Sequence, residues 1–336
     1  MVTMLRINAA EMLRTFNLIL GNHGFLPEKA LQCGEIFTGN SVDGVYTHGV
    51  NRFARFIQNT DSGLIKPREM PTLKSKSAGI EQWDGQLGPG PLNALHVTDI
   101  AMDLARQYGI GCVGLSNTNH WMRGGTYGWK AAKAGFVFIG WTNTISNMPA
   151  WGAIDKKIGN NPLVLALPYK EEAIVLDMAM SQFSFGAMEL ASMKKEMLPV
   201  FGGYDQEGQL TKDPDTIIAS GRPVPIGFWK GAGLSLLLDI LATILSGGLS
   251  TSEISKQKTE SSLSQVFIAI DLSQLGNYAM IPVLINNIIK DYHESLPVST
   301  HQSVSYPGER VLRTRKKNLE DGIPVLENIW EEILRL

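Results

Sequence analysis

Cysteine is scarce in this chain, since only Cys33 and Cys112 occur among its 336 residues. Two cysteines in a chain of this length do not make the disulfide framework of a small secreted protein. The first six residues also lack the apolar stretch and cleavage site of a signal peptide. We therefore expect a cytoplasmic protein whose two thiols stay free.

An excess of charge and a long apolar run are missing as well. The formal net charge is −2, which gives no electrostatic basis for binding nucleic acid or an anionic membrane. The longest apolar stretch, Leu234 to Leu245, is interrupted by Ser235, Asp239 and Thr243 and is too short to span a bilayer. We expect neither nucleic acid nor membrane among the partners. Apolar residues make up 44% of the chain, which is enough for a sizeable core.

Several catalytic signatures are also absent. The six histidines are scattered, with no H-E-x-x-H and no C-x-x-C, so we expect no metal site. No Walker A sequence and no G-x-S-x-G nucleophile elbow occur. One G-x-G-x-x-G run, at residues 109–114, follows a predicted helix and enters a predicted strand. A Rossmann fingerprint has the opposite order, so this run predicts a helix-to-strand turn.

Hydrophobic spacing predicts helices first and then a mixture of helices and strands. Asn8 and Glu11 form a capping-box pattern, and Pro27 opens a second helix. Residues 61–92 read as loops with one short strand at 80–83. Beyond them we expect strands at 112–115, 136–141, 163–167, 174–178 and 266–270, helices at 93–108, 127–134, 186–193, 231–245 and 281–292, and a closing helix at 324–336.

This order predicts the α/β class, with a layered α/β core flanked by a helical N-terminal layer that the C-terminal helix joins. We expect residues 1–75 to form a helical domain, completed by residues 310–336. Residues 76–309 would form the α/β domain.

Three basic residues form the strongest candidate site. If residues 47–57 are a helix capped by Thr47, His48, Arg52 and Arg55 lie at i, i+4 and i+7 on one face. Val50, Phe53 and Ile57 would pack the opposite face down. An imidazole that can give a proton would then lie beside guanidinium groups that can bind a carboxylate, as reduction of a keto acid requires. The alternative is a solvated basic face on a surface helix.

Two further segments carry possible ligand groups. Lys230, Gly231 and Gly233 precede a long apolar helix, and free N–H groups at a helix start can bind an anion. His120 follows a predicted strand, where ligand groups gather in α/β domains. Asp239 lies among leucines and needs a polar partner.

Several segments together resemble the type 2 malate/L-lactate dehydrogenase family of NAD(P)-dependent oxidoreductases. The resemblance runs along nearly the whole chain. Within the family it is nearest to a reductase of a sugar-derived diketo acid, on residues 81–84, 120–125 and 228–230. The matching segments are Tyr46–Phe53, Asn119–Gly125, Trp141–Asn143, Gly159–Pro162, Asp177–Ser181, Trp229–Gly231 and Pro307–Glu309.

The resemblance implies a nicotinamide cofactor bound on a fold that is not Rossmann, with NADH expected and NADPH possible. It makes His48 the catalytic proton donor. Arg52, on spacing and resemblance together, is expected to bind the substrate carboxylate, with Arg55 or Arg123 in support, and His120 is a further catalytic candidate. The resemblance also implies that three segments contact the cofactor. They are Ala173, Ile174, Val175, Leu176, Asp177, Met178 and Ala179; Trp229 and Lys230; and Gly308, Glu309 and Arg310. Glu309 stands where a close relative has histidine.

We thus expect an NADH-dependent reductase of a sugar-derived 2-keto acid that forms a homodimer. Family members acting on malate, lactate, ureidoglycolate or cyclic imino acids offer alternative substrates on the same fold. A protein that binds a nucleotide or sugar acid without catalysis is the alternative of another class.

Overall fold

A seven-stranded sheet forms the centre of the molecule. The computed structural model describes residues 3–298 and 303–336. Only the β3–β4 pair is parallel, and the other neighbours are antiparallel, whereas a Rossmann sheet is mostly parallel. The strand order is β2 (Thr72–Ser77), β3 (Ile80–Asp84), β4 (Ile110–Thr118), β12 (Leu263–Asp271), β5 (Phe136–Thr142), β8 (Leu163–Tyr169) and β9 (Glu172–Met178).

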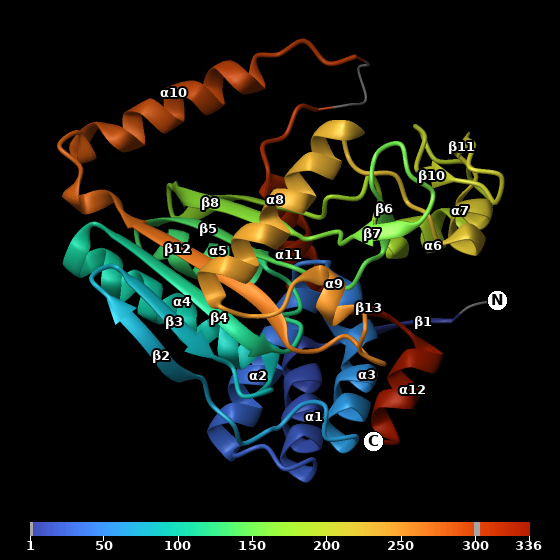
Figure 1. Ribbon diagram of the computed structural model, residues 1–336, viewed down its shortest axis with the longest axis horizontal. Helices are drawn as coiled ribbons and strands as arrows, with labels where there is room; N and C mark the ends of the chain where they lie inside the picture. Colours follow the sequence, from blue (N-terminus) through green and yellow to red (C-terminus); the bar gives the residue numbers. More distant parts are fainter. Residues whose placement is uncertain (1–2, 299–302) are drawn as a thin grey trace.

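Helices cover both faces of this sheet (Figure 1). Because side chains alternate along a strand, Phe267 and Ala269 of β12 pack with α4 (Gly90–Tyr108) and α5 (Gly125–Lys133). Val266, on the opposite face, packs with α8 (Trp229–Ser246). The structure is therefore a layered α/β fold, as predicted.

A helical layer lies below the sheet in Figure 1. Phe16 and Phe53 stack with ring centroids 3.9 Å apart, and Trp330 packs beside them. The predicted N-terminal helical layer, joined by a C-terminal helix, is confirmed. It consists of α1 (Ala9–Asn22), α2 (Pro27–Val42), α3 (Val50–Asp61) and α12 (Glu327–Leu334), with the small sheet of β1 (Met4–Ile7) and β13 (Ile323–Leu326). The domain boundaries near residues 75 and 310 stay a prediction.

The remaining elements lie around the sheet. They are η1 (Tyr46–His48), β6 (Met148–Pro149), β7 (Lys156–Ile158), α6 (Phe185–Lys194), β10 (Gly203–Tyr204), β11 (Leu210–Thr211), α7 (Pro214–Ser220), α9 (Thr251–Ile254), η2 (Leu272–Gln274), η3 (Tyr278–Met280), α10 (Ile281–His293) and α11 (Glu309–Asp321). Figure 1 shows α10 lying away from the sheet, and Ile289 is its only buried residue.

Two predicted segments differ from the structure. Pro324 lies in β13, paired with Arg6 of β1, and the closing helix begins only at Glu327. The pairing of β13 with β1, far away in sequence, overrides the helical pattern. In residues 61–92, β2 was not predicted because its six residues are all exposed and show no apolar alternation.

Two other predictions are confirmed. Gly109 ends α4 with a φ of 82°, and β4 begins at the next residue, so the G-x-G-x-x-G run is a helix-to-strand turn. Asp239 of α8 accepts hydrogen bonds from the Asn143 side chain (2.9 Å) and the Thr251 backbone N–H (2.8 Å). These partners satisfy a carboxylate that would otherwise be costly to bury.

Candidate active site

His48 lies in a single 3₁₀ turn, η1, between α2 and α3. The predicted helix start at Thr47 is wrong, because α3 begins at Val50. The Ser41 hydroxyl of α2 accepts a hydrogen bond from the Val50 N–H (2.8 Å) and takes the place of an N-cap. A Cβ on Gly49 would lie 2.3 Å from the Ser41 Oγ, so only glycine fits between the turn and the helix.

The new helix start changes how the basic residues are arranged. His48 and Arg52 are not on one helical face, although Arg52 and Arg55 both belong to α3. The prediction that Val50, Phe53 and Ile57 pack inward is confirmed, since all three are buried.

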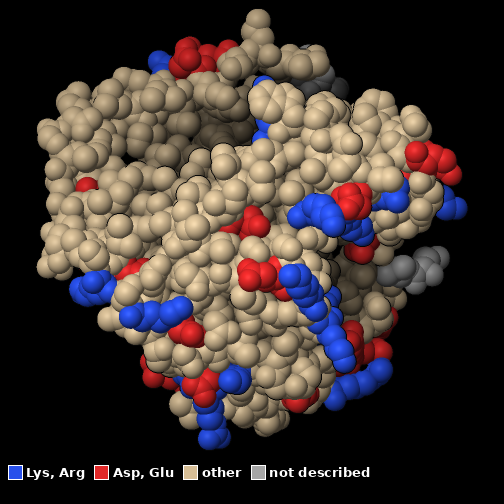
Figure 2. All heavy atoms as spheres, in the orientation of Figure 1, with Lys and Arg blue, Asp and Glu red and all other residues tan. Residues whose placement is uncertain are grey.

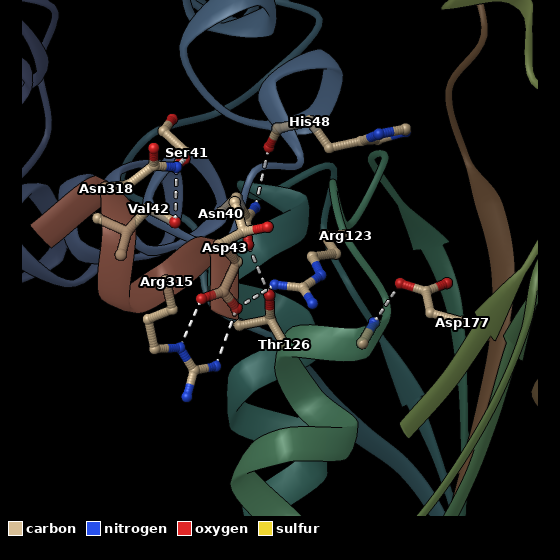
Figure 3. A network of polar contacts seen from close by, with 12 residues as sticks. Asn40, Ser41, Val42, Asp43, His48, Arg123, Thr126, Asp177, Arg315 and Asn318 are labelled. Atoms are coloured by element: carbon tan, nitrogen blue, oxygen red, sulfur yellow. Dashed lines mark hydrogen bonds and ion pairs between the residues drawn. The ribbon is translucent and has the colours of Figure 1, made fainter. Parts of the chain in front are cut away.

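The side chain of Asn40 holds the backbone of His48 in place (Figure 3). The Asn40 Nδ2 donates to the His48 carbonyl (2.9 Å), and the Thr126 hydroxyl donates to the Asn40 Oδ1 (2.7 Å). The Thr47 Oγ1 lies 3.1 Å from the His48 Nδ1. These contacts orient the ring, and among the residues described none makes a hydrogen bond to its Nε2.

An ion network supports the same region. Asp43, almost fully buried, pairs with Arg123 and with Arg315 of α11, whose Nε lies 2.6 Å from the Asp43 Oδ1. Asn318 of α11 donates to the Val42 carbonyl (2.9 Å). Figure 3 shows how α11 thereby holds the end of α2 against α5. A buried carboxylate with two guanidinium partners is costly to break once it has formed.

The cavity beside His48, which we call the main cavity, has a volume of about 460 Å³, within the usual range of small-molecule sites. His48, His120, Arg123 and Asp177 line it. Asp177 is open to the cavity and accepts a hydrogen bond from the Gly125 N–H (2.7 Å). Burial by the surrounding wall raises the pKa of the Asp177 carboxyl, although Arg123 and this hydrogen bond oppose the shift.

His48 and His120 both line this cavity, and their rings are stacked with centroids 5.6 Å apart. Burial, His120, Arg52 and Arg123 lower the pKa of His48 to about 3. Burial, Arg52 and Arg55 lower the pKa of His120 to about 3. Both imidazoles are therefore neutral at neutral pH without an anion beside them. The His120 Nδ1 accepts from the Met122 N–H (3.0 Å), so its Nε2 carries the proton.

A second, smaller cavity adjoins the first, and His120 and Met122 line both. Arg52 and Arg55 lie on its wall, with Glu260 from the loop between α9 and β12. Asn59, Asn119 and Thr259 also contribute to the lining. Arg52 and His48 therefore line different cavities, and His120 lines both.

A family model for malate/L-lactate dehydrogenases matches residues 7–334. The chain belongs to this family. The family prediction is thereby confirmed, and this dehydrogenase-family member is an oxidoreductase.

Curated relatives match this dehydrogenase-family member along its full length. The 2,3-diketo-L-gulonate reductase of Klebsiella pneumoniae is 41% identical over 333 residues, covering 99% of this chain and 100% of that protein. The protein of the same name from Escherichia coli K12 is 40% identical with the same coverage. The crystal structure of malate dehydrogenase from Entamoeba histolytica, 22% identical, has a TM-score of 0.92 and covers 99% of this chain and 97% of that one, which shows the shared fold.

A dehydrogenase family implies a nicotinamide cofactor, and the main cavity fits such a group. β9 is an edge strand, so one row of its backbone groups has no neighbouring strand. The Pro307 carbonyl accepts from the Val175 N–H (3.0 Å), which brings the 307–310 loop to this edge. A Cβ on Gly308, whose φ is +94°, would lie 3.2 Å from the Val175 nitrogen. This close backbone approach forms one wall of the cavity.

The predicted cofactor residues divide into two groups. Val175, Leu176, Asp177, Ala179, Gly308 and Arg310 line the main cavity. The others do not. Ala173 is buried among core side chains, and Met178 packs against the core on the α8 side of the sheet. The lining also lacks Ile174, Trp229 and Lys230. Trp229 lies at the start of α8 and is 65% exposed.

Glu309 also points elsewhere. Its Oε2 lies 3.1 Å from the His293 Nε2 of α10 and accepts from the Tyr306 N–H (3.1 Å). Glu309 thus ties the 306–309 turn to α10.

Several lining residues were not predicted as site residues. Thr144, Asn160 and Ser184 line the main cavity, and Glu260 lines the small one. The motif around Asn160 carried part of the resemblance, but Glu260 lies in a polar loop with no sequence signal.

Among the residues that the structure describes, no group of three or more His, Cys, Asp or Glu side chains is arranged to hold a metal.

Proposed function

We propose that this protein reduces 2,3-diketo-L-gulonate to 3-keto-L-gulonate with NADH. The observation that carries the proposal is the full-length identity of 40–41% to proteins named 2,3-diketo-L-gulonate reductase. The cavity supports it, because a histidine on a fixed backbone faces a space large enough for reactants.

His48 is the proposed proton donor. A bound nicotinamide supplies the hydride that the ketone carbon accepts. His48, in its imidazolium form, gives its Nε2 proton to the oxygen as negative charge develops there and returns to the neutral imidazole, which typically accelerates a reaction by about 10²–10⁴-fold. Arg52 binds the substrate carboxylate in the small cavity, with Arg55 beside it. The His120 Nε2–H, between the two cavities, donates to the substrate where it passes from one to the other.

The edge of β9 and the 308–310 loop are the proposed cofactor site. Backbone groups of residues 173–179 that have no strand partner can hydrogen-bond the carboxamide of the nicotinamide. Arg310, which lines the cavity, is placed to meet a phosphate. NADPH is the alternative cofactor. Steady-state rates of reduction measured with NADH and with NADPH show which of the two the protein uses.

A homodimer is the proposed assembly, with α8 in the interface. Leu234, Leu237, Leu241 and Ile244 lie on one exposed face of α8, and Figure 2 shows a largely uncharged surface over α8 and α10. Monomers rarely expose so continuous an apolar surface. In such a dimer Trp229 and Lys230 at the start of α8 would reach the cofactor of the partner subunit, which explains their absence from the cavity of their own chain.

The same helix is long and apolar enough to cross a membrane, and 33% of its 18-residue window is buried. We propose that a second copy of the chain covers α8 instead of lipid. Asp239 in the middle of the helix and its two polar partners favour packing against protein. With both cysteines free, the proposed location is the cytoplasm.

Loss of the near-UV absorbance of NADH on addition of 2,3-diketo-L-gulonate tests the function directly. We expect a kcat/KM for this substrate well above those for pyruvate, oxaloacetate and cyclic imino acids, and a higher rate with NADH than with NADPH. Binding of NADH without its oxidation by any of these acids would contradict the proposal and favour a non-catalytic binding protein.

A further inference from the structure

The small cavity combines two positive side chains with a carboxyl group. Arg52 and Arg55 lie one turn apart on α3, and Glu260 lies on the loop before β12. Arg123 and Arg315 are both paired with Asp43. In the described part of the chain, no ion pair joins Arg52 or Arg55 to a carboxylate. The positive charge of Arg52 and Arg55 is therefore still available to a ligand.

Glu260 is held in place but keeps one oxygen free. Its Oε2 accepts a hydrogen bond from the Ile145 N–H (3.2 Å). Among the residues described, none donates to its Oε1. Burial raises the pKa of Glu260, while the Ile145 hydrogen bond, Arg52 and Arg55 oppose the shift. A partly buried carboxyl group with one unused oxygen on a cavity wall can select the group opposite it.

The size of the cavity limits what can enter. Its volume of about 30 Å³ holds roughly two water molecules, or one polar end group of a larger molecule. Asn59 and Thr259 add polar atoms to the wall. The occupant must thus accept hydrogen bonds from guanidinium groups and donate one to Glu260. The carboxylate of a hydroxylated keto acid accepts these bonds, and a hydroxyl farther along its chain can donate to Glu260. A second carboxylate at that point of the chain cannot donate and would lie beside a like charge.

We propose that Glu260 determines the substrate class by accepting a hydrogen bond from a hydroxyl of the substrate chain and repelling a second carboxylate. The proposal rests on the proposed function, because the substrate must extend from His48 past His120 into the small cavity. Selection of this kind can combine an attractive contact with the preferred ligand and a repulsive one with its competitor. Hydroxylated 2-keto monoacids gain the first, and dicarboxylic keto acids meet the second.

Two substitutions separate the hydrogen bond from the charge. Glu260→Gln keeps an oxygen for the Ile145 N–H and for a substrate hydroxyl but removes the charge. Glu260→Ala removes both. The kcat/KM of each is measured with 2,3-diketo-L-gulonate, with oxaloacetate and with pyruvate, which has neither a hydroxylated chain nor a second carboxylate. Glu207→Gln, at an exposed turn, is the matched control.

We expect Glu260→Ala to lose roughly 10–100-fold with the hydroxylated acid, as for a hydrogen bond to a charged group. Glu260→Gln should lose less than Glu260→Ala with that acid and raise the kcat/KM for oxaloacetate about tenfold or more relative to that for pyruvate, which has only the shared carboxylate. The control should stay unchanged with all three acids. An equal fall for all three acids, or an unchanged ratio of hydroxylated to dicarboxylic acid in Glu260→Gln, would overturn the proposal. Should Glu260→Ala fail to fold, the Glu260→Gln ratio decides alone.

The same assays distinguish an error in the proposed function from an error in the proposed role of Glu260. If the wild type does not reduce 2,3-diketo-L-gulonate but reduces oxaloacetate, the proposed function is wrong. The response of oxaloacetate to Glu260→Gln then still decides the role of Glu260, since a gain supports the repulsion and no gain overturns it. A wild type that reduces none of the three acids overturns both.

Discussion

The ring centroids of His48 and His120 lie 5.6 Å apart, with the rings at an angle of 25° to each other, although 71 residues lie between them in the sequence. The 3₁₀ turn after α2 carries one ring, and the segment after β4 carries the other. Burial and neighbouring positive charge lower the pKa of both rings. His48 lines the cavity proposed for the cofactor, and His120 lines both that cavity and the one proposed for the substrate carboxylate.

Two variants of His120 test its proposed role as a neutral hydrogen-bond donor. His120→Asn keeps an acceptor for the Met122 N–H but has no donor at the Nε2 position, whereas His120→Gln keeps a donor there. We expect His120→Asn to lower kcat/KM by roughly 10–100-fold, the loss typical of a hydrogen bond to a charged group, and His120→Gln to recover part of it. Steady-state kinetics with equal losses in both variants would assign His120 a packing role only.

The pH dependence follows from the lowered pKa of His48. With a pKa of about 3 in the free enzyme, its protonated fraction falls about tenfold for each unit of pH above that value. We expect kcat/KM for reduction, which reports the free enzyme, to fall with this slope between about pH 5 and 9, while kcat/KM for the reverse oxidation stays flat. The bound carboxylate raises the pKa of His48, so kcat should level off at low pH. Reduction with a flat kcat/KM between about pH 6 and 9 would contradict this.

Asp43→Asn should destabilise the fold strongly, because it leaves Arg123 buried without its carboxylate and weakens the hold on Arg315. Breaking one partner of a buried ion pair costs about 3–5 kcal/mol. Asp103→Asn is the matched control, since its pair with Arg106 is exposed and worth about 1 kcal/mol or less. Denaturant unfolding measures both. Equal free energies of unfolding for the two variants would show that the Asp43 network contributes little.

How much of this was predictable from the sequence differs between the elements and the site. The strands around Phe138, Val164 and Phe267 were predicted because buried strands show continuous apolar runs. The break at Gly49 was not, since the hydroxyl that caps α3 belongs to Ser41 in the preceding helix. The small cavity had no signal because α3, the segment after β4 and the Glu260 loop meet only in three dimensions.

The proposed dimer predicts a specific response to charge on α8. Leu237 is 56% exposed on that helix, and Leu18 of α1 is 67% exposed on the helical layer. Leu237→Lys should convert a dimer into a monomer, because it places a charge in an apolar interface, whereas Leu18→Lys should leave the dimer intact. Sedimentation velocity distinguishes the two masses. A monomeric wild type, or a Leu237→Lys variant that remains dimeric, would refute this interface.

The turnover of His48→Asn, measured together with its affinity for NADH, tests the proton-donor assignment most directly. His96→Asn serves as the control, because His96 packs against Trp83 and lines neither cavity. We predict that His48→Asn binds NADH with unchanged affinity, measured by cofactor fluorescence, and reduces substrate about 10²–10⁴-fold more slowly than the wild type. A His48→Asn variant that turns over at the wild-type rate would contradict the account.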